Sequence, residues 1–89
     1  MSGNQDFLGK NYPNPVSGKT TIPFRLNKSG KLTIKLYNIR GSLVQEIASG
    51  NYSSGENIVT FDSTNLPSGI YFYQLESSGI RQAKKMIIK

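Results

Sequence analysis

The stretch from Leu66 to Leu75, with the sequence LPSGIYFYQL, limits the fold of this chain more than any other segment. A Pro-Ser-Gly turn leads into a run that is apolar on both alternating faces, with Ile70 and Phe72 on one face and Tyr71, Tyr73 and Leu75 on the other. Strands with two apolar faces are typical of the interior of a sheet. We therefore expect this strand to lie centrally, with the remaining strands packed around it.

The composition restricts the chain to a small domain without cysteine chemistry. A chain of 89 residues forms one domain that buries roughly 60 to 65% of its unfolded surface, which leaves little room for a large substrate cavity. The sequence contains no cysteine, so neither disulfides nor thiolate metal sites stabilise it. Its net charge of +6 and its pI of about 9.8 favour contact with anionic surfaces.

Five further segments are expected to be strands, most of them with the alternation of period two that is typical of strands, although the alternation in 43–48 is unclear. They span roughly residues 20–26, 31–37, 43–48, 56–61 and 81–89, and turn residues separate them. Pro23 cannot donate a hydrogen bond to a neighbouring strand, so its segment is expected at the edge of a sheet. Asn38–Gly41 is expected to form a hairpin turn in which Gly41 has a positive φ, and Gly50–Gly55 is expected to be a loop.

The pattern as a whole predicts an all-β fold, an immunoglobulin-like antiparallel β-sandwich of about seven strands. Residues 1–10 are polar and are predicted to be a linker or the remnant of an expression start, and residues 11–89 to be the folded domain. At its start, the prolines of Asn11–Pro15 favour a stiff, extended lead-in whose Tyr12 docks on the sandwich.

The side chains that most enzymes use for catalysis are scarce. Histidine and cysteine are both missing, which excludes Ser-His-Asp triads, cysteine nucleophiles and His-ligated zinc. The acidic residues are separated along the chain and are interpreted as solvated charges: Asp6, Glu46, Glu56, Asp62 and Glu76. We therefore expect no enzymatic activity, no cofactor and no metal. Nucleic acid is not expected as a partner either, because the aromatic run Tyr71–Tyr73 is better explained as core than as a platform for bases.

A set of short motifs occurs in a fixed order over nearly the whole chain. It comprises Tyr12–Pro15, Thr21–Phe24, Leu36–Asn38 with Gly41, Gly55, Val59, Phe61–Asp62, Leu66–Tyr71 and Lys84–Met86. In order and spacing this set, which runs from Asn11 to Lys89, resembles the C-terminal sorting domain of proteins exported by type IX secretion. The resemblance implies a non-catalytic, immunoglobulin-like sandwich.

The resemblance also implies a function and partners. Such domains direct the cargo protein that precedes them through the outer-membrane translocon, after a signal peptide has delivered it to the periplasm of a Gram-negative bacterium. A sortase-like peptidase then removes the domain and joins the cargo to an anionic lipopolysaccharide, so the cargo is secreted or attached to the cell surface. The recognition residues implied are Pro13, Pro15, Gly69, Tyr71, Lys84, Lys85, Ile87, Ile88 and Lys89.

These residues give rise to specific expectations. A final strand that ends the chain exposes its edge and its basic side chains, so removal of Ile87–Lys89 is expected to impair export more than folding. A free edge of this kind would also permit an edge-strand dimer. Gly69 and Tyr71 are expected to maintain the fold, and Gly69→Trp is expected to unfold the domain by obstructing the turn.

Two other functions stay open on the sequence alone. An accessory or carbohydrate-binding domain of a secreted hydrolase would present a row of exposed aromatic side chains, for which Tyr37, Tyr52 and Phe72 are the candidates. A structural domain similar to the immunoglobulin-like part of a flagellar hook-capping protein would carry a comparable Gly-x-Tyr strand, but would continue into other segments. The cargo, the translocon component that binds and the cleavage position are not encoded in these residues.

Overall fold

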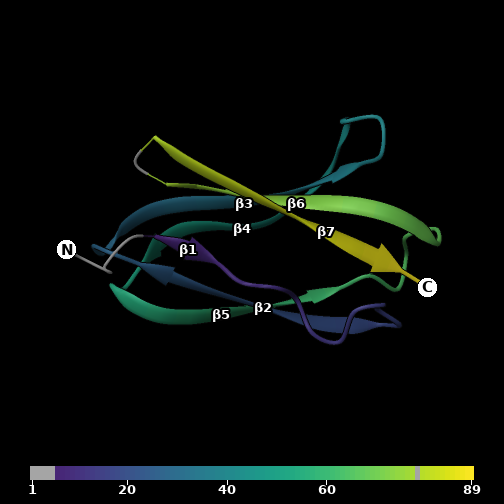
Figure 1. Ribbon diagram of the computed structural model, residues 1–89, viewed down its shortest axis with the longest axis horizontal. Helices are drawn as coiled ribbons and strands as arrows, with labels where there is room; N and C mark the ends of the chain where they lie inside the picture. Colours follow the sequence, from purple (N-terminus) through teal and green to yellow (C-terminus); the bar gives the residue numbers. More distant parts are fainter. Residues whose placement is uncertain (1–5, 78) are drawn as a thin grey trace.

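The protein is a sandwich of two antiparallel β-sheets (Figure 1). The structure is a computed structural model that describes residues 6–77 and 79–89. The strands are β1 (Phe7–Leu8), β2 (Lys19–Leu26), β3 (Gly30–Asn38), β4 (Leu43–Tyr52), β5 (Gly55–Asp62), β6 (Gly69–Ser77) and β7 (Ile80–Ile88). One sheet has the strand order β1-β2-β5 and the other β4-β3-β6-β7. The predicted all-β, immunoglobulin-like sandwich is therefore confirmed.

Strand β6 lies inside the four-stranded sheet, between β3 and β7, as its apolar sequence predicts. On its inner face, Tyr73 and Leu75 have no exposed surface. On its outer face, Ile70 and Phe72 are 40% and 37% exposed. A sandwich of two layers covers each sheet on one face only, so the second apolar face of β6 is left toward solvent.

Strand β2 lies between β1 and β5, so the predicted edge position of the Pro23 segment is wrong. Backbone hydrogen bonds join Thr21 to Tyr12, and Pro23, two residues further, faces the same side of β2. The chain segment on that side is irregular, and it has no carbonyl group that needs a hydrogen bond from an amide at position 23. The Pro23 carbonyl itself accepts a hydrogen bond of 2.8 Å from the Gly9 amide. The proline therefore occupies an interior strand without leaving a partner unpaired.

Residues before Asn11 also pack against the sandwich, while the domain boundary between residues 10 and 11 stays a prediction. Phe7 and Leu8 pair with β2, and Leu8 is completely buried. The carboxylate of Asp6 accepts a hydrogen bond of 2.7 Å from the Asn27 amide. A strand of two residues is too short to show a period of two, which is why the sequence pattern does not reveal it. Residues 1–5 of the predicted linker lie outside the described residues.

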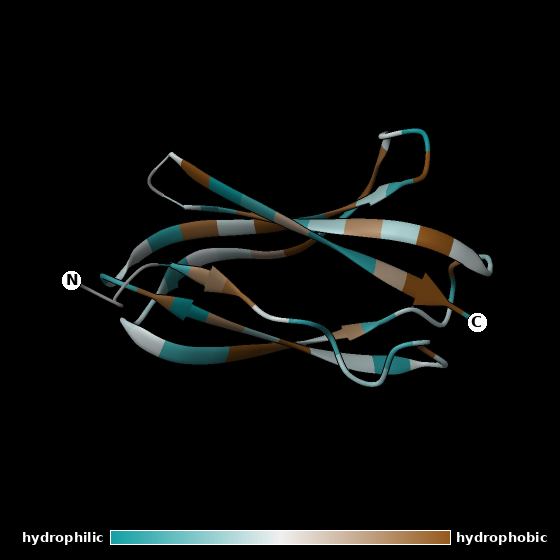
Figure 2. Cartoon of the chain, in the orientation of Figure 1, coloured by the Kyte–Doolittle hydropathy of each residue, from teal (hydrophilic) through white to brown (hydrophobic). Residues whose placement is uncertain are grey.

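The core lies between the two sheets and receives apolar side chains from β1, the lead-in and most of the strands. Its buried members are Leu8, Val16, Ile22, Phe24, Leu26, Leu32, Ile34, Leu36, Phe61, Tyr71, Tyr73, Leu75, Met86 and Ile88. Hydrophobic and hydrophilic residues alternate along the strands that supply them (Figure 2). In the part of the chain that the structure describes, no helix is long and apolar enough to cross a membrane.

The turns on either side of β4 are both predicted from turn-forming residues, and only one of them forms as predicted. The turn at Asn38–Gly41 forms as predicted, with a φ of 83° at Gly41 and the Asn38 side chain accepting hydrogen bonds from the Arg40 and Ser42 amides. The predicted loop at Gly50–Gly55 is wrong over its first half, because β4 continues to Tyr52 opposite the start of β3. The Tyr52 ring packs edge-on against the ring of Phe24 in the other sheet, at 5.4 Å between centroids.

Candidate functional site at one edge of the sandwich

The lead-in crosses from one sheet to the other along one edge of the sandwich. Tyr12 pairs with Thr21 of β2 through two backbone hydrogen bonds of 2.8 and 2.9 Å. Four residues later, the Val16 amide donates to the Ile87 carbonyl at 2.7 Å, and the Lys89 amide donates to the Val16 carbonyl at 2.8 Å. The lead-in motif and the end of β7 thus lie side by side. We call residues Pro13–Val16 together with Ile87–Lys89 the terminal corner.

A buried tyrosine holds the lead-in in place. The hydroxyl of Tyr73 donates a hydrogen bond of 2.7 Å to the Gly9 carbonyl and accepts one of 2.8 Å from the Asn11 amide. Burial raises the pKa of Tyr73, and the hydrogen bond from Asn11 opposes this rise. The Asn11 side chain in turn donates to the hydroxyl of Thr20 at 3.1 Å. These polar contacts tie residues 9–11 to strands of both sheets.

The chain approaches β2 closely at Gly9. A Cβ atom at this position would lie 2.8 Å from Cγ of Pro23 and 3.1 Å from its carbonyl oxygen. Only glycine fits here without displacing the ring of Pro23. Further along β7, the Gln82 side chain accepts a hydrogen bond from the Leu8 amide and donates one to the Asp6 carbonyl. The N-terminal segment is therefore attached to β7 at two separate places.

The two prolines of the lead-in lie on the surface of the terminal corner. Pro13 and Pro15 are exposed, and both follow cis peptide bonds. Between them, the Asn14 side chain accepts a hydrogen bond of 3.0 Å from the Ile87 amide. The backbone of Tyr12 pairs with β2, while its side chain is 55% exposed on the surface of the sandwich.

The predicted recognition residues at the end of the chain have different surroundings. Lys85 and Lys89 are exposed, Lys84 and Ile87 are half-buried, and Ile88 is a core residue with 3% exposure. The edge of β7 is not open at its end, since Ile87 and Lys89 already pair with the lead-in. Removal of Ile87–Lys89 takes the buried Ile88 side chain out of the core, so we expect it to impair folding too, and whether export suffers more than folding stays a prediction.

Gly69 and Tyr71 belong to the interior of the same region. Gly69 is opposite Ile88 in the ladder of β6 and β7, and the hydroxyl of the buried Tyr71 donates to the Pro67 carbonyl at 2.8 Å. A Cβ atom at Gly69 would meet a single neighbour within 4 Å, an atom of Tyr71 at 3.9 Å. The φ of Gly69 is +156°, a conformation that L side chains rarely adopt, so a substitution strains the backbone here, and the unfolding of the domain by Gly69→Trp stays a prediction.

The structure brings six of the nine predicted recognition residues to the terminal corner or directly beside it: Pro13, Pro15, Gly69, Ile87, Ile88 and Lys89. Lys84 and Lys85 lie further along β7, opposite Tyr73 and Phe72, and Tyr71 is opposite Met86. Sequence reasoning assigned no individual role to Asn14 or Val16, although they make the contacts. Asn14 belongs to the quoted motif, but no local pattern marks the partner of a polar side chain 73 positions away.

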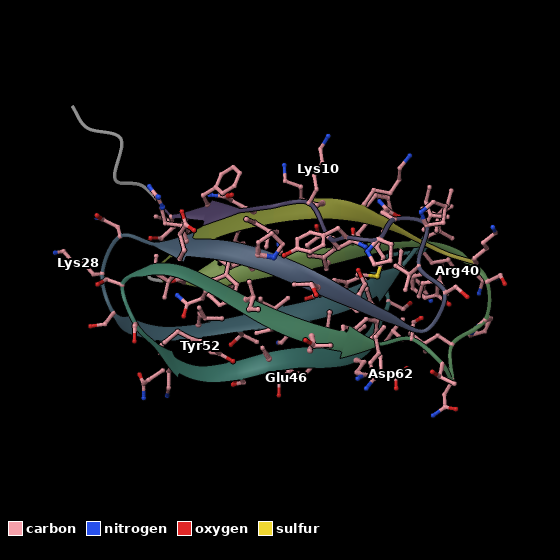
Figure 3. The ribbon with its side chains drawn as sticks, turned by 90° about the horizontal axis from the view of Figure 1, so that it is seen from below. Lys10, Lys28, Arg40, Glu46, Tyr52 and Asp62 are labelled. Atoms are coloured by element: carbon pink, nitrogen blue, oxygen red, sulfur yellow. The ribbon has the colours of Figure 1, made fainter. Side chains whose placement is uncertain are left out.

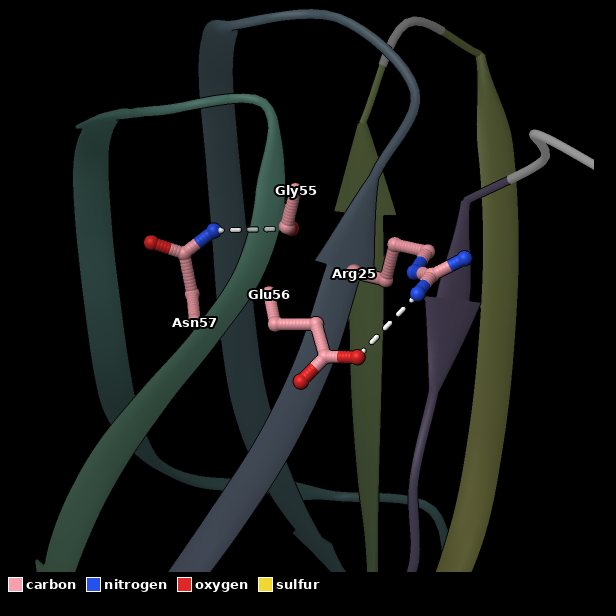
Figure 4. Close-up of polar contacts among 4 residues, drawn as sticks. All are labelled: Arg25, Gly55, Glu56 and Asn57. Atoms are coloured by element: carbon pink, nitrogen blue, oxygen red, sulfur yellow. Dashed lines mark hydrogen bonds and ion pairs between the residues drawn. The ribbon is translucent and has the colours of Figure 1, made fainter.

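The charges leave this part of the molecule basic. Among the described residues, ion pairs occur between Arg25 and Glu56 at 3.1 Å and between Arg81 and Glu76 at 3.2 Å, and neither involves Lys84, Lys85 or Lys89. Both pairs are solvent-exposed, and the first lies on the other sheet (Figure 4). The corner and the adjacent strand therefore offer a rigid backbone and cationic side chains to a partner.

Chemistry of the kind that enzymes perform finds little support in the described part of the chain. No group of three or more His, Cys, Asp or Glu side chains there is placed to hold a metal ion. Hydrogen bonds from the hydroxyl and the amide of Thr64 lower the pKa of Asp62, the carboxylate whose environment is most distinct. These are the contacts of a turn, and Asp62 is fully exposed.

The aromatic row required by a carbohydrate-binding module does not form. Tyr37 and Phe72 are opposite each other on the outer face of the four-stranded sheet. Tyr52 instead packs against Phe24 toward the core. Two of the three candidates therefore share a surface, while the third has a structural role.

Comparison with known protein families agrees with the geometry. Residues 10–89 match the family described as secretion system C-terminal sorting domain. A search of curated proteins found no match. The family match includes the lead-in, strands β2 to β7 and the whole terminal corner, and it supports neither of the alternative functions. The chain therefore belongs to the family of secretion system C-terminal sorting domains, which act as signals for type IX secretion.

Proposed function

We propose that the folded domain is an address, read in the periplasm by components of the outer-membrane type IX translocon, and that the terminal corner is part of the surface that they read. The observation that carries this proposal is the pairing of Val16 with Ile87 and Lys89, which joins two motifs from opposite ends of the chain. A translocon component that contacts the corner would contact both motifs at once, and only when the domain is folded.

In this proposal the domain itself has no catalytic role, and its nine predicted recognition residues divide into two groups. Pro13, Pro15, Lys85, Ile87 and Lys89 offer surface for contact. Gly69, Tyr71 and Ile88 support the corner from inside, and Lys84 lies half-buried between the groups. Loss of a supporting residue would abolish export by unfolding the address.

A reporter fusion tests the function. A signal peptide, a fluorescent protein and residues Asp6–Lys89 are joined and expressed in a bacterium that has the type IX machinery, and extracellular and surface fluorescence are measured. We expect export that requires both the domain and a working translocon. A second fusion that begins at Asn11 lacks the buried Leu8 and the contacts of Gly9, and is expected to be exported less because it folds less well.

Charge reversal in the corner tests the site. Lys89→Glu is expected to reduce export several-fold without changing the melting temperature, because Lys89 is exposed and unpaired with any acid of the described residues. Lys28→Glu is the matched control, since Lys28 is an exposed lysine at the end of the molecule opposite Arg40 (Figure 3). Periplasmic retention of a folded wild-type fusion would contradict the proposed function, and equal effects of both reversals would contradict the site.

We further propose that a sortase-like peptidase removes the domain after export and that the cargo becomes attached to an anionic lipopolysaccharide. Mass spectrometry of the exported reporter tests this step. A reporter without the domain and with an added glycolipid is expected, whereas an intact fusion in the medium would contradict processing. If the isolated domain dimerises through an edge strand, β4 and β5 are the candidates, since each lies at the edge of its sheet while the end of β7 is covered, and sedimentation of wild-type domain at increasing concentration would detect it.

A further inference from the structure

The outer face of the four-stranded sheet carries an apolar row that runs across all its strands. Leu43 of β4 is opposite Tyr37 of β3, Tyr37 is opposite Phe72 of β6, and Phe72 is opposite Lys85 of β7. In the adjacent position, Ile70 is opposite Ile87. Leu43, Ile70 and Phe72 are 56%, 40% and 37% exposed. Directly opposite side chains on one face of a sheet are neighbours, so these residues form one patch and are not scattered apolar residues.

A hollow of about 470 Å³ adjoins this row at the β3–β4 hairpin. Its walls include Tyr37, Phe72 and the turn residues Ile39 and Arg40. The turn is held by the Asn38 side chain, which accepts hydrogen bonds from two amides, so it presents Ile39 in a fixed position at 69% exposure. The patch thus combines a flat apolar strip with a shaped depression, as the anchor regions of protein interfaces do.

Cations surround the apolar row. Lys85 continues it on β7, Arg40 lies at the hollow, and Lys35 is one step along β3 from Tyr37. None of these three forms an ion pair within residues 6–77 and 79–89, where the pairs found are those of Arg25 and Arg81. Lys35 is opposite Glu46 of β4, so the excess positive charge at the border comes from Arg40 and Lys85. An apolar centre with such a border is complementary to an apolar surface bordered by carboxylates.

We propose that this outer face is a second docking surface, which binds a protein whose own apolar patch has an acidic border. The inference rests on the proposed function, for which it names a partner surface that adjoins the terminal corner at Ile87 and extends from there across β6, β3 and β4. A protein is favoured over nucleic acid because three of the five apolar side chains, Leu43, Ile70 and Ile87, are aliphatic and cannot stack on bases. It is favoured over a lipid bilayer because Ile70 and Phe72 lie in the sheet with more than half of their surface covered, and do not protrude.

Binding of the purified chain to two kinds of vesicle tests the partner class. One kind is prepared from outer membranes of a bacterium with the type IX machinery, and the other is reconstituted from lipids extracted from the same membranes. We expect binding to the native vesicles that weakens as salt is raised and that is lost after protease treatment of the vesicles. Equal binding to the lipid vesicles would overturn the proposal and assign the face to anionic membrane.

Matched variants test the surface. Phe72→Ser and the pair Arg40→Glu with Lys85→Glu are each expected to weaken binding about tenfold or more while leaving the fold intact. The controls are Ile58→Ser, an apolar side chain 63% exposed on the other sheet, and Lys28→Glu, and both are expected to bind as wild type. Unchanged binding of the face variants, or equal losses in the controls, would refute the surface. Circular dichroism melts show that each variant is folded before binding is compared.

The same variants separate this inference from the proposed function. Failure of the wild-type fusion to leave the periplasm, together with binding that depends on Phe72, would refute the function and retain the surface. Normal export of the Phe72→Ser fusion would retain the function and refute the surface.

Discussion

The two long edges of the sandwich are built in opposite ways. At one edge the N-terminal segment spans both sheets, and the hydrogen bonds that attach it, such as those of the Tyr73 hydroxyl, are buried. At the other edge β4 and β5 follow each other through a short turn, and its polar contacts are exposed, such as the bond from the Asn57 side chain to the Gly55 carbonyl (Figure 4).

This difference determines which contacts contribute most to the free energy of unfolding. A buried hydrogen bond cannot be replaced by one to water, so its loss leaves polar groups unsatisfied. An exposed bond exchanges with water at little cost. The closed edge therefore concentrates both the stability of the domain and the residues of the terminal corner, while the open edge tolerates change.

The largest expected effect comes from the buried hydroxyl at the closed edge. Tyr73→Phe leaves the Gly9 carbonyl and the Asn11 amide without their partner, and we expect a loss of roughly 2 to 5 kcal/mol in the free energy of unfolding. Urea denaturation measures it. Tyr52→Phe is the control at the open edge, and a change of more than about 0.5 kcal/mol there would break the comparison.

A smaller effect is expected from the close approach of the lead-in to β2. Gly9→Ala places a methyl group 2.8 Å from the Pro23 ring, and we expect a loss of about 1 to 3 kcal/mol as the two segments separate. Gly30→Ala is the control, since nothing lies within 4 Å of its Cβ position and its φ is not positive. If the two variants unfold at the same urea concentration, the lead-in is not held as closely as described.

The closed edge should also be the more sensitive one at alkaline pH. Because burial raises the pKa of Tyr73 above its ordinary value of 10.0, the folded state keeps the proton that the unfolded state releases. Its contribution to stability is complete below pH 10 and is lost as the pH rises through the folded pKa. Urea denaturation at a series of pH values measures how the free energy of unfolding decreases as the pH rises. This decrease should be smaller for Tyr73→Phe than for wild type. Equal decreases would contradict the role of this group.

The smallest effect is expected at the surface of the terminal corner. Asn14→Ala removes an exposed hydrogen bond to the Ile87 amide and should cost about 0.5 to 1 kcal/mol, with faster hydrogen exchange at that amide. Asn57→Ala, which removes exposed bonds at the open edge, should leave the exchange of Ile87 unchanged. If the hydrogen-exchange rate of the Ile87 amide is the same in Asn14→Ala as in wild type, the lead-in does not hold the end of β7.

Several parts of this architecture follow from local sequence signals. Alternation correctly marks β3, with Leu32, Ile34 and Leu36 inside, and the two-sided apolar run correctly makes β6 an interior strand. The turn at Asn38–Gly41 follows from residue chemistry alone. Such signals are reliable because they depend on residues within a few positions of each other.

The predictions that were wrong all concern contacts between distant segments. Pro23 suggested an edge, but whether its missing amide matters depends on what lies beside it. The glycine-rich stretch after Ser49 suggested a loop, but β3 offers it a partner as far as Tyr52.

For the candidate site, too, the sequence predicts the motifs but not the contacts between them. The sequence names the prolines of the lead-in and the basic, apolar last strand, and the match to the family of secretion sorting domains covers both. It does not show that Asn14 and Val16 pair with the end of β7, or that Ile88 is buried while Lys85 is exposed.

By itself, then, the sequence determined the class of fold, the interior strand, the turns and the motifs that mark the family, because periodicity and turn chemistry act over short stretches. The tertiary structure alone decided which edge is closed, which recognition residues meet, and which apolar face of β6 stays in solvent. Those outcomes depend on how two sheets share one core, and a sheet can be covered by its partner on only one side.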